Sequence, residues 1–398
     1  MRLCGPLEIE DYGIQPMADA SPPKWHLAHT SWFFETFLLK RQLADYQPFN
    51  PQFEQIYNSY YNGIGKPFPR AERGRLSRPT VAEVVAYREH VDAGMRQLLS
   101  DPSLLSERVT EITSIGLQHE QQHQELLLTD LKYNFGTNPL YPAYRDDLVR
   151  KPIAAGEALS WIESEGGLRE IGRDPDRNFA FDNERPRHSV FVQPHALASR
   201  LVNNQEYLAF IEAGGYQDPR WWLADGWSHC QTQGWSAPLY WLRRGDDWFS
   251  YEFSGLQPLN PHAAVSHVSF YEADAFARWS GARLPTEQEW ECAAASLSID
   301  GNFVDSDVLQ PLASKGEGLT QMYGDCWEWT GSGYAPYPGY RPMTGTLGEY
   351  NGKFMANQMV LRGGSCLTPQ NHIRPSYRNF FYPPDRWQCS GIRLTRDL

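Results

Sequence analysis

The pattern of apolar residues changes between about residues 136 and 160, and this change constrains the fold more than any other feature. Before it, apolar residues recur at intervals of three and four, which is typical of amphipathic helices. After about Ala155, short apolar stretches alternate with Gly, Pro and Asn, which is typical of strands and turns. A chain of 398 residues is long for a single hydrophobic core. We therefore predict a two-domain α+β protein, with a helical bundle over residues 1–150 and an irregular α+β domain over residues 151–398.

Three helices are predicted in the first domain, over residues 21–43, 80–100 and 101–135. Ser21 is a good N-cap, and Pro22 suits the first helical position. Thr80 and Glu83 have the spacing of a capping box. Residues 57–79 contain too many Gly and Pro for a helix, and long loops of this kind are often functional. In the second domain, short helices are predicted over residues 204–213 and 271–281, and strands in HSVFVQP, VLRGGSC and SGIRLTR.

Two histidines in LQHEQQHQELLL are spaced like metal ligands. His119 and His123 are one helical turn apart, so they project from one face and can share an ion. A third ligand is needed, and His29 in WHLAHTSWFFE is the best candidate. His26, three residues earlier, is an equally available imidazole, and a hydrogen-bonded core pair remains an alternative for His119 and His123. If His29 completes the set, the site is an uncharged cup with open coordination positions, which favours catalysis.

The same residues fit a zinc-peptidase pattern. His119-Glu120-Gln121-Gln122-His123 matches H-E-x-x-H, in which the glutamate activates water. Such enzymes usually take their third ligand downstream of the helix, whereas the notable histidine here is upstream. A zinc metallopeptidase therefore stays open as an alternative.

Composition restricts the partners. The formal net charge is −12 and no basic block offsets it, which argues against nucleic acid and favours small-molecule substrates. Six cysteines occur without any C-x-x-C, which suits a reducing cytoplasm. No apolar run approaches the roughly 20 residues that span a bilayer, and the first residues lack the pattern of a signal peptide. We therefore expect a cytoplasmic protein with no membrane partner; the sequence leaves the oligomeric state open.

Motifs along nearly the whole chain resemble one family. They are, in order, WHLAHTSWFFE, NSYYN, LQHEQQHQELL, VSFYEADAFARW, RLPTEQEWE, GDCWEWT, GEYNGKF, NQMVLRGGSC and HIRPSYRNFFYPPDRWQ. This order is similar to that of the ergothioneine-biosynthesis sulfoxide synthases, the EgtB family of hercynine oxygenases. The resemblance implies a DinB-like, iron-binding helical bundle over residues 1–150. It implies a formylglycine-generating-enzyme-like (sulfatase-modifying-factor-type), or C-type-lectin-like, domain over residues 151–398, with the active site at the junction.

The resemblance also implies the chemistry. Similar enzymes use non-haem iron(II) and O2 to join a cysteine-type thiol to the imidazole of hercynine, giving a sulfoxide. In that family the histidine of W-x-L-A-H and both histidines of H-x-x-x-H hold the iron, which selects His29, His119 and His123 here. A related enzyme that uses a selenium or another sulfur donor stays open as an alternative. Under this interpretation Glu120 is an ordinary helix residue.

Further site residues follow from the resemblance. Tyr60 and Tyr61 match a tyrosine pair that serves as proton donor in one subtype; the other subtype uses a tyrosine after W-E-W, a region that shows no clean equivalent here. Contacts to hercynine are expected from Gln122, Asn379, Phe380 and Phe381, with the two phenylalanines meeting its trimethylammonium group.

The thiol substrate carries carboxylates, which suit arginine. Arg70, Arg73, Arg75 and Arg78 follow the tyrosine pair, and Arg386 lies in the last motif. We expect Arg70, Arg73 and Arg386 to bind the thiol substrate, although a solvated charge run is the alternative for the first four. The Tyr-Tyr, Phe-Phe subtype favours free cysteine over γ-glutamylcysteine.

Overall fold

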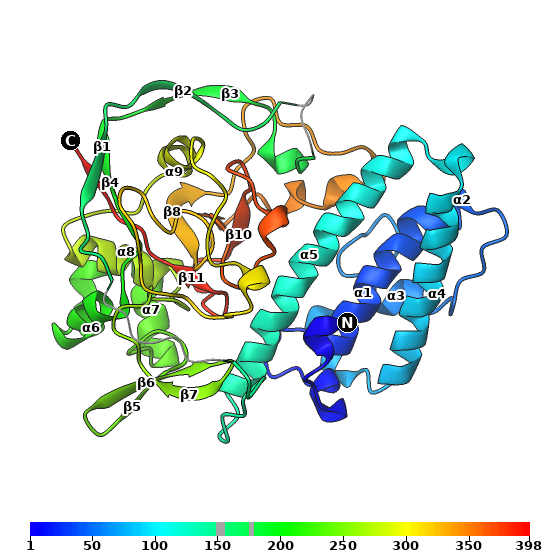
Figure 1. The fold of residues 1–398 in the computed structure, drawn as a ribbon, viewed down its shortest axis with the longest axis horizontal. Helices are drawn as coiled ribbons and strands as arrows, with labels where there is room; N and C mark the ends of the chain where they lie inside the picture. Colours follow the sequence, from blue (N-terminus) through cyan, green and yellow to red (C-terminus); the bar gives the residue numbers. More distant parts are fainter. Residues whose placement is uncertain (149–155, 175–178) are drawn as a thin grey trace. The chain divides into compact units, whose positions relative to one another are not determined.

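The computed structural model describes residues 1–148, 156–174 and 179–398. The chain forms two compact units, the first comprising Met1–Phe135 with Met343–Tyr350 and the second Gly136–Pro342 with Asn351–Leu398 (Figure 1). The predicted boundary between residues 150 and 151 lies outside the described residues. Within the described ranges, no helix combines the length and the apolar character that crossing a bilayer requires.

The first unit is helical. Its helices are α1 (Pro23–Phe34), α2 (Lys40–Gln42), α3 (Phe53–Ile56), α4 (Val81–Ser100) and α5 (Glu107–Gly136, whose last residue belongs to the second unit). A π-helical turn, η3 (Glu35–Leu39), joins α1 to α2, and short 3-10 turns include η4 (Arg70–Arg75) and η9 (Gly345–Glu349). Thr80 caps α4 in the predicted capping box, whereas α1 begins one residue later than expected, after Pro22.

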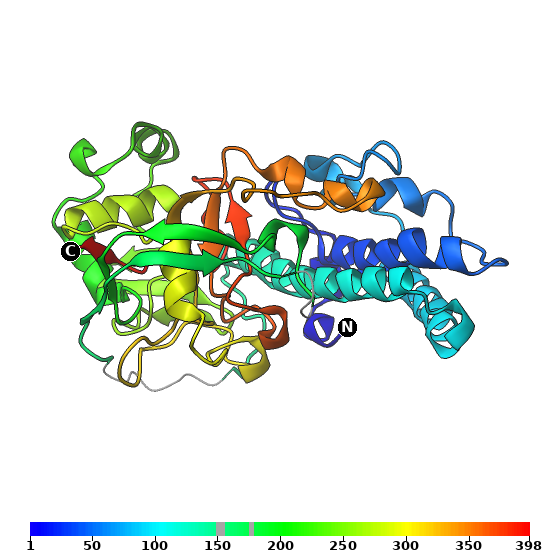
Figure 2. The same cartoon turned by 90° about the horizontal axis from the view of Figure 1, so that it is seen from above.

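Helix α1 is the centre of this unit, since nearly all its side chains are buried. Figures 1 and 2 show α1 and α5 running alongside each other. Gly116 on α5 permits the close approach: a Cβ there would lie 2.5 Å from Cε1 of Phe34 and 3.1 Å from Cε1 of Phe33. His119 follows one turn later on the same helix, so the contact at Gly116 sets how near that ring comes to α1.

The second unit is an irregular α+β domain. Its helices are α6 (Asn204–Glu212), α7 (Ala224–Gln233), α8 (Phe270–Trp279) and α9 (Glu287–Ala294). The strands are β1 (Trp161–Ser164), β2 (Gly167–Ile171), β3 (His188–Val192), β4 (His195–Ala198), β5 (Trp241–Arg244), β6 (Asp247–Glu252), β7 (Gly255–Pro258), β8 (Trp327–Gly333), β9 (Met359–Arg362), β10 (Asn379–Phe381), β11 (Ser390–Gly391) and β12 (Thr395–Asp397). They form small sheets ordered β1-β4-β12, β10-β9-β8-β11, β2-β3 and β5-β6-β7.

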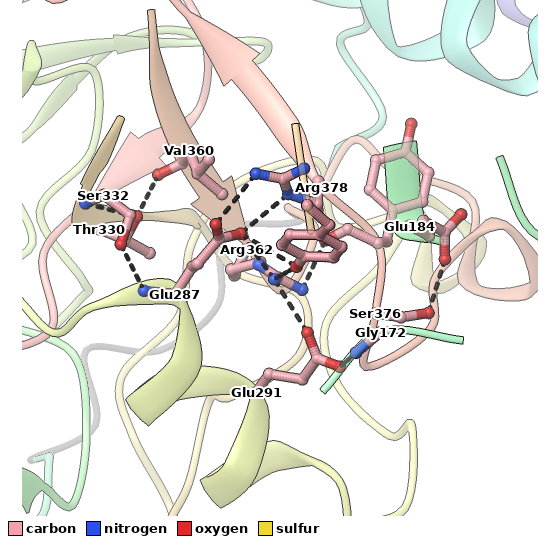
Figure 3. Close-up of polar contacts among 12 residues, drawn as sticks. Gly172, Glu184, Glu287, Glu291, Thr330, Ser332, Val360, Arg362, Ser376 and Arg378 are labelled. Atoms are coloured by element: carbon pink, nitrogen blue, oxygen red, sulfur yellow. Dashed lines mark hydrogen bonds and ion pairs between the residues drawn. The ribbon is translucent and has the colours of Figure 1, made fainter. Parts of the chain in front are cut away.

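Buried charges organise the core of the second unit (Figure 3). The carboxylate of Glu287 on α9 accepts two hydrogen bonds from Arg378, at 2.9 and 3.0 Å, and one from Arg362 on β9 at 2.9 Å. Arg362 also contacts Glu291 at 3.0 Å. Against the raising effect of burial, Arg378 and then Arg362 hold the pKa of Glu287 below its usual value. Because Arg378 directly precedes β10, this network anchors the strand that begins at Asn379.

Candidate metal centre

The three candidate ligands lie together in the first unit. Their ligand atoms are all within 4.8 Å of one another, and Nε2 of His29 is 3.1 Å from Nε2 of His119. His29 and His119 are buried and His123 is half-buried. Within the described ranges, these three form the one cluster of His, Cys, Asp or Glu side chains close enough to hold a metal ion. Helix α1 contributes one ring and α5 contributes two from successive turns.

Hydrogen bonds fix the orientation of two of these rings. Nδ1 of His29 lies 2.6 Å from the carbonyl oxygen of Tyr57, so it donates there and Nε2 carries the lone pair. Nδ1 of His123 lies 2.8 Å from Nδ1 of His26, which leaves Nε2 of His123 for the centre. Nδ1 of His119 is buried and has no hydrogen-bond partner among the described residues. Two of the three rings are therefore pre-oriented by their neighbours.

The rings are uncharged at neutral pH. Burial, and then the electrostatic influence of the neighbouring His26 side chain, lowers the pKa of His119 to about 3. Desolvation and His119 likewise place the pKa values of His29 and His123 well below the ordinary value for histidine. Neutral imidazole is the form that binds metal ions, so the three rings are in the protonation state that a cation requires.

The donor set fits a divalent transition metal. Two imidazole nitrogens bound to one ion at about 2.1 Å and at right angles lie about 3.0 Å apart, close to the separation of His29 and His119. Imidazole suits iron, zinc, copper and nickel, so the ring set by itself does not choose among them. Three protein ligands leave further coordination positions for substrates, as in catalytic rather than structural sites.

Glu120 is engaged elsewhere. Its Oε1 accepts a hydrogen bond from Nη2 of Arg88 on α4 at 2.5 Å, and both side chains are about one-fifth exposed, at 21% and 18%. The pairing occupies the carboxylate that a zinc peptidase would use to activate water. This contact agrees with the interpretation of Glu120 as an ordinary helix residue.

Two stacked tyrosines are linked to His29 through Trp32, whose ring centre lies 5.4 Å from that of His29. Tyr61 is fully buried, and its ring lies 5.7 Å from Trp32 and 5.1 Å from Phe37. The Tyr60 ring stacks on Tyr61 at 4.6 Å, and their hydroxyl oxygens are 3.5 Å apart. Burial, and then Tyr60, raises the pKa of Tyr61 well above its usual value, so the phenol keeps its proton.

Tyr350 is a site residue that sequence reasoning missed. Its ring lies 5.9 Å from the His119 ring and 6.4 Å from the Tyr60 ring, and its hydroxyl donates to Oε1 of Gln122. Gln122 thus faces a phenol within the first unit, one residue before His123. The segment GEYNGKF was the available signal, but the many Gly and Pro residues around it gave no periodicity by which to place it.

Glu349 holds the segment Met343–Tyr350 against the rest of the helical unit. Its carboxylate accepts from the backbone nitrogens of Asn62 and Gly63, at 3.0 and 2.8 Å. A Cβ at Gly63 would lie 2.8 Å from Oγ1 of Thr346, so the absence of a side chain there allows the contact. Residues 343–350 therefore lie beside the turn that carries Tyr60 and Tyr61.

The two predicted arginines of the first unit differ in setting. Arg70 is exposed, whereas Arg73 is only 1% exposed. Arg73 donates to Oγ of Ser21 at 2.8 Å and to Oγ of Ser59 at 2.9 Å, and its guanidinium carbon lies 3.4 Å from the centre of the Trp25 ring. Its Nε has no partner, and no carboxylate pairs with it among the described residues. Burial, and then Arg70, lowers the pKa of Arg73 well below its usual value.

The remaining predicted contacts belong to the second unit. Asn379 pairs with Leu361 in the sheet, and its side-chain oxygen accepts from the backbone nitrogen of Phe380 at 2.9 Å. Phe380 stacks on Tyr334 at 4.1 Å, while the Phe381 ring lies 6.1 Å from that of Trp387. All three side chains are half-buried.

Arg386 has protein partners of its own. It donates to Glu272 at 3.0 Å and to the carbonyl oxygen of Ala237 at 2.8 Å, and it packs over Trp235. These contacts give Arg386 a structural role within the second unit, and its role toward a substrate stays a prediction.

Comparisons with known proteins agree with the two-unit architecture. The DinB superfamily model matches residues 1–127, and the model of the sulfatase-modifying factor enzyme 1-like domain matches residues 154–316 and 298–398. The expected fold class is thereby confirmed, with a DinB-like helical domain before a formylglycine-generating-enzyme-like domain.

Two named relatives match along almost the whole chain, and a third matches about two thirds of it. The hercynine oxygenase of Mycolicibacterium smegmatis is 31% identical over 95% of this chain and 91% of its own length. That of Mycolicibacterium thermoresistibile is 32% identical over 95% of this chain and 88% of its own length. A formylglycine-generating enzyme of Thermomonospora curvata is 26% identical over 64% of this chain and 99% of its own length.

Proposed function

Because the chain belongs to the hercynine oxygenase family, we propose that it is a non-haem iron(II)-dependent sulfoxide synthase of ergothioneine biosynthesis. It would join hercynine to a cysteine-type thiol with O2, and free cysteine is favoured over γ-glutamylcysteine. The observation that carries the proposal is the cluster of His29, His119 and His123 in a chain of this family. When bound, iron(II) would supply O2 activation and a positive charge that attracts a substrate thiolate.

The three histidines would hold iron without adding negative charge to it. Nε2 of His29 and Nε2 of His123 are directed to the centre by the partners of their Nδ1 atoms. A set of neutral rings leaves the full charge of the cation for substrates, unlike a set that contains a carboxylate. The burial that lowers the pKa values of His29 and His119 keeps this set uncharged at neutral pH.

Arg73 would bind a carboxylate of the thiol substrate. A buried guanidinium with an unpartnered Nε and no carboxylate partner is costly unless a ligand supplies the anion. Planar two-point pairing with a carboxylate is what arginine does best. Arg70 is exposed, and Lys66 lies four residues before it in the sequence. The charge of Arg70 would attract the anionic substrate at longer range.

A tyrosine would supply the proton that the reaction needs. The hydroxyl of Tyr61 keeps its proton because burial raises its pKa, and the hydroxyl of Tyr60 lies 3.5 Å away. Tyr350 offers a third phenol beside His119. Positioned general acids contribute about 10²- to 10⁴-fold to rate.

For hercynine, we propose contacts from Gln122, Asn379, Phe380 and Phe381. Gln122 stands one residue before His123 and is oriented by the Tyr350 hydroxyl. The rings of Phe380 and Phe381 are of the type that meets a trimethylammonium group, which cannot donate hydrogen bonds. Partners are thus small molecules, and we place the enzyme in the cytoplasm because its six cysteines, scattered without any C-x-x-C, suit a reducing compartment.

The decisive experiment uses the full chain reconstituted with iron(II) in the absence of O2. Hercynine and either cysteine or γ-glutamylcysteine are added, O2 is admitted, and the products are identified by mass spectrometry. We expect the coupled sulfoxide, with a higher kcat/KM for cysteine. A coupled product formed only with a selenol or with another thiol would move the assignment to that donor.

The peptidase alternative is tested in parallel. Zinc-loaded protein is incubated with a peptide library, and Glu120→Gln is compared with the unaltered chain in both assays. We expect neither protein to cleave peptides. Glu120→Gln should form sulfoxide at a near-normal rate, because Glu120 pairs with Arg88. Peptide cleavage that Glu120→Gln abolishes would overturn the proposed function.

A further inference from the structure

We propose that His26 and Asp130 form an outer pair that orients His123 for metal binding. The inference rests on the proposed function in one respect, namely that His29, His119 and His123 hold the metal. It concerns two residues that the expected ligand set does not contain. Both are buried, with 3% of each residue exposed.

The contacts form an unbroken chain. Oδ2 of Asp130 lies 3.0 Å from Nε2 of His26, and Nδ1 of His26 lies 2.8 Å from Nδ1 of His123. Oδ2 of Asp130 also accepts a hydrogen bond from the backbone nitrogen of Ser21 at 2.7 Å. The carboxylate is thus held in place by the chain just before α1, independently of His26.

These contacts dictate the proton positions. A carboxylate that accepts from Ser21 also accepts from Nε2 of His26, so the proton of a neutral His26 ring is on Nε2. Nδ1 of His26 is then an acceptor, and Nδ1 of His123 must be the donor in the 2.8 Å contact. The lone pair of His123 is consequently on Nε2, the atom left for the centre. Asp130 sets the tautomer of a ring that it does not touch.

Helix geometry explains how the pair is built. His26 precedes His29 by three residues on α1, and Asp130 follows His123 by seven on α5, so each residue of the pair shares a helix face with a ligand. The same two helices therefore supply both the ligands and their supports. His26 is not a fourth ligand in this arrangement, because its two ring nitrogens are already engaged by His123 and Asp130.

A buried ion pair that only stabilises the bundle is the competing explanation. The two differ in what they predict for metal binding, since an outer partner changes metal affinity by about 10- to 100-fold. A stabilising contact would change the unfolding temperature of the metal-free protein and leave affinity at the folded site unaltered.

The test measures the affinity of the metal-free full chain for Co(II) and for Fe(II) under anaerobic conditions. The variants are His26→Phe, Asp130→Asn and the double variant, and His90→Phe on α4 is the matched control. His90 is a histidine of the same unit whose Nε2 contacts the carbonyl oxygen of Gln47. We expect each single change to weaken binding about 10- to 100-fold. The double variant should be no weaker than the weaker single one, because both remove the same chain of contacts.

A second measurement does not depend on any variant folding. Nitrogen NMR of the unaltered chain with ¹⁵N-labelled histidine should show His123 with its proton on Nδ1, both metal-free and with Zn(II) bound. A proton on Nε2 of His123 would overturn the inference, as would affinities within about twofold of the unaltered chain. Neither measurement includes a substrate. If the unaltered chain binds metal but makes no sulfoxide, only the proposed function fails; if sulfoxide forms but the variants bind metal normally, only this inference fails.

Discussion

His29 and His26 lie three residues apart on one buried helix, yet their hydrogen bonds suit them to different roles. A carbonyl oxygen holds Nδ1 of His29 and frees Nε2, whereas His26 is engaged at both nitrogens. The sequence could not separate them, because spacing alone places either ring near α5. The family resemblance selected His29, and the difference in hydrogen bonding supplies a physical reason for that choice.

Replacing His29 with Ala should lower metal affinity by more than the roughly 100-fold that is the upper end for an outer partner. His26→Ala should cause a smaller loss, because it disturbs the orientation of His123 but removes no ligand. Titration of the metal-free chain with Fe(II), followed by metal analysis after gel filtration, compares the two. Equal losses from both variants would contradict the assignment of different roles.

Tyr61→Phe should leave metal affinity unaltered and slow sulfoxide formation by about 10²-fold or more, with part of the thiol oxidised without coupling. Tyr61→Phe removes only the hydroxyl and keeps the buried ring in place, so the fold should persist. Product ratios by mass spectrometry give the readout, and Tyr60→Phe and Tyr350→Phe are measured beside it. If Tyr61→Phe behaves like the unaltered chain while Tyr350→Phe is slow, Tyr350 is the proton donor.

Long periodic helices could be predicted from the sequence, and so could several short elements of the second unit, since the expected helices over residues 204–213 and 271–281 correspond to α6 and α8. The expected helices over residues 80–100 and 101–135 correspond to α4 and α5, apart from a turn before Glu107. By contrast α7 and α9 were not expected. Helix α7 buries only Gly226 and Cys230, and three of the residues that α9 buries are glutamates, so neither shows a clear apolar period. Contacts between distant segments, such as Tyr350 with Gln122, leave no local pattern at all.

The contact at Gly116 leads to a prediction about helix packing. Gly116→Ala puts a methyl group 2.5 Å from Phe34, and overpacking of this kind costs about 1 to 3 kcal/mol of unfolding free energy. Because His119 lies one turn away, metal affinity should fall as well. Urea unfolding and Co(II) titration measure the two effects. Gly13→Ala is the control, since a Cβ there meets nothing within 4 Å; a loss of stability without any loss of affinity would separate the packing contact from the site.

In the complete molecule, one buried carboxyl should make stability depend on pH. Burial raises the pKa of Asp325 to about 6, although Asn302, the Leu312 backbone and Gln321 donate hydrogen bonds to it. The folded protein then holds a proton that the unfolded chain releases near pH 4. The stabilisation is complete below about pH 4 and is lost as pH rises through about 6, a change on the order of 3 kcal/mol.

The free energy of unfolding of Asp325→Asn, relative to that of the unaltered chain, should therefore be higher at pH 7.5 than at pH 4.5. Oδ1 accepts from both Asn302 and Leu312, and an asparagine oxygen can keep those bonds while the Gln321 amide turns. Urea unfolding at the two pH values gives the difference. A difference that does not change with pH would show that this carboxyl titrates normally.

Residues 343–350 interrupt the second unit and return to it at Asn351, so the first unit is not a contiguous stretch of the gene. A fragment ending at Phe135 would keep all three histidines and lose Tyr350, and could bind metal while lacking one phenol beside it. A gene rearrangement that exchanged the first unit as a whole would thus also have to transfer Met343–Tyr350. A single cut after Phe135 therefore cannot release the complete first unit, because Met343–Tyr350 would stay with the other fragment.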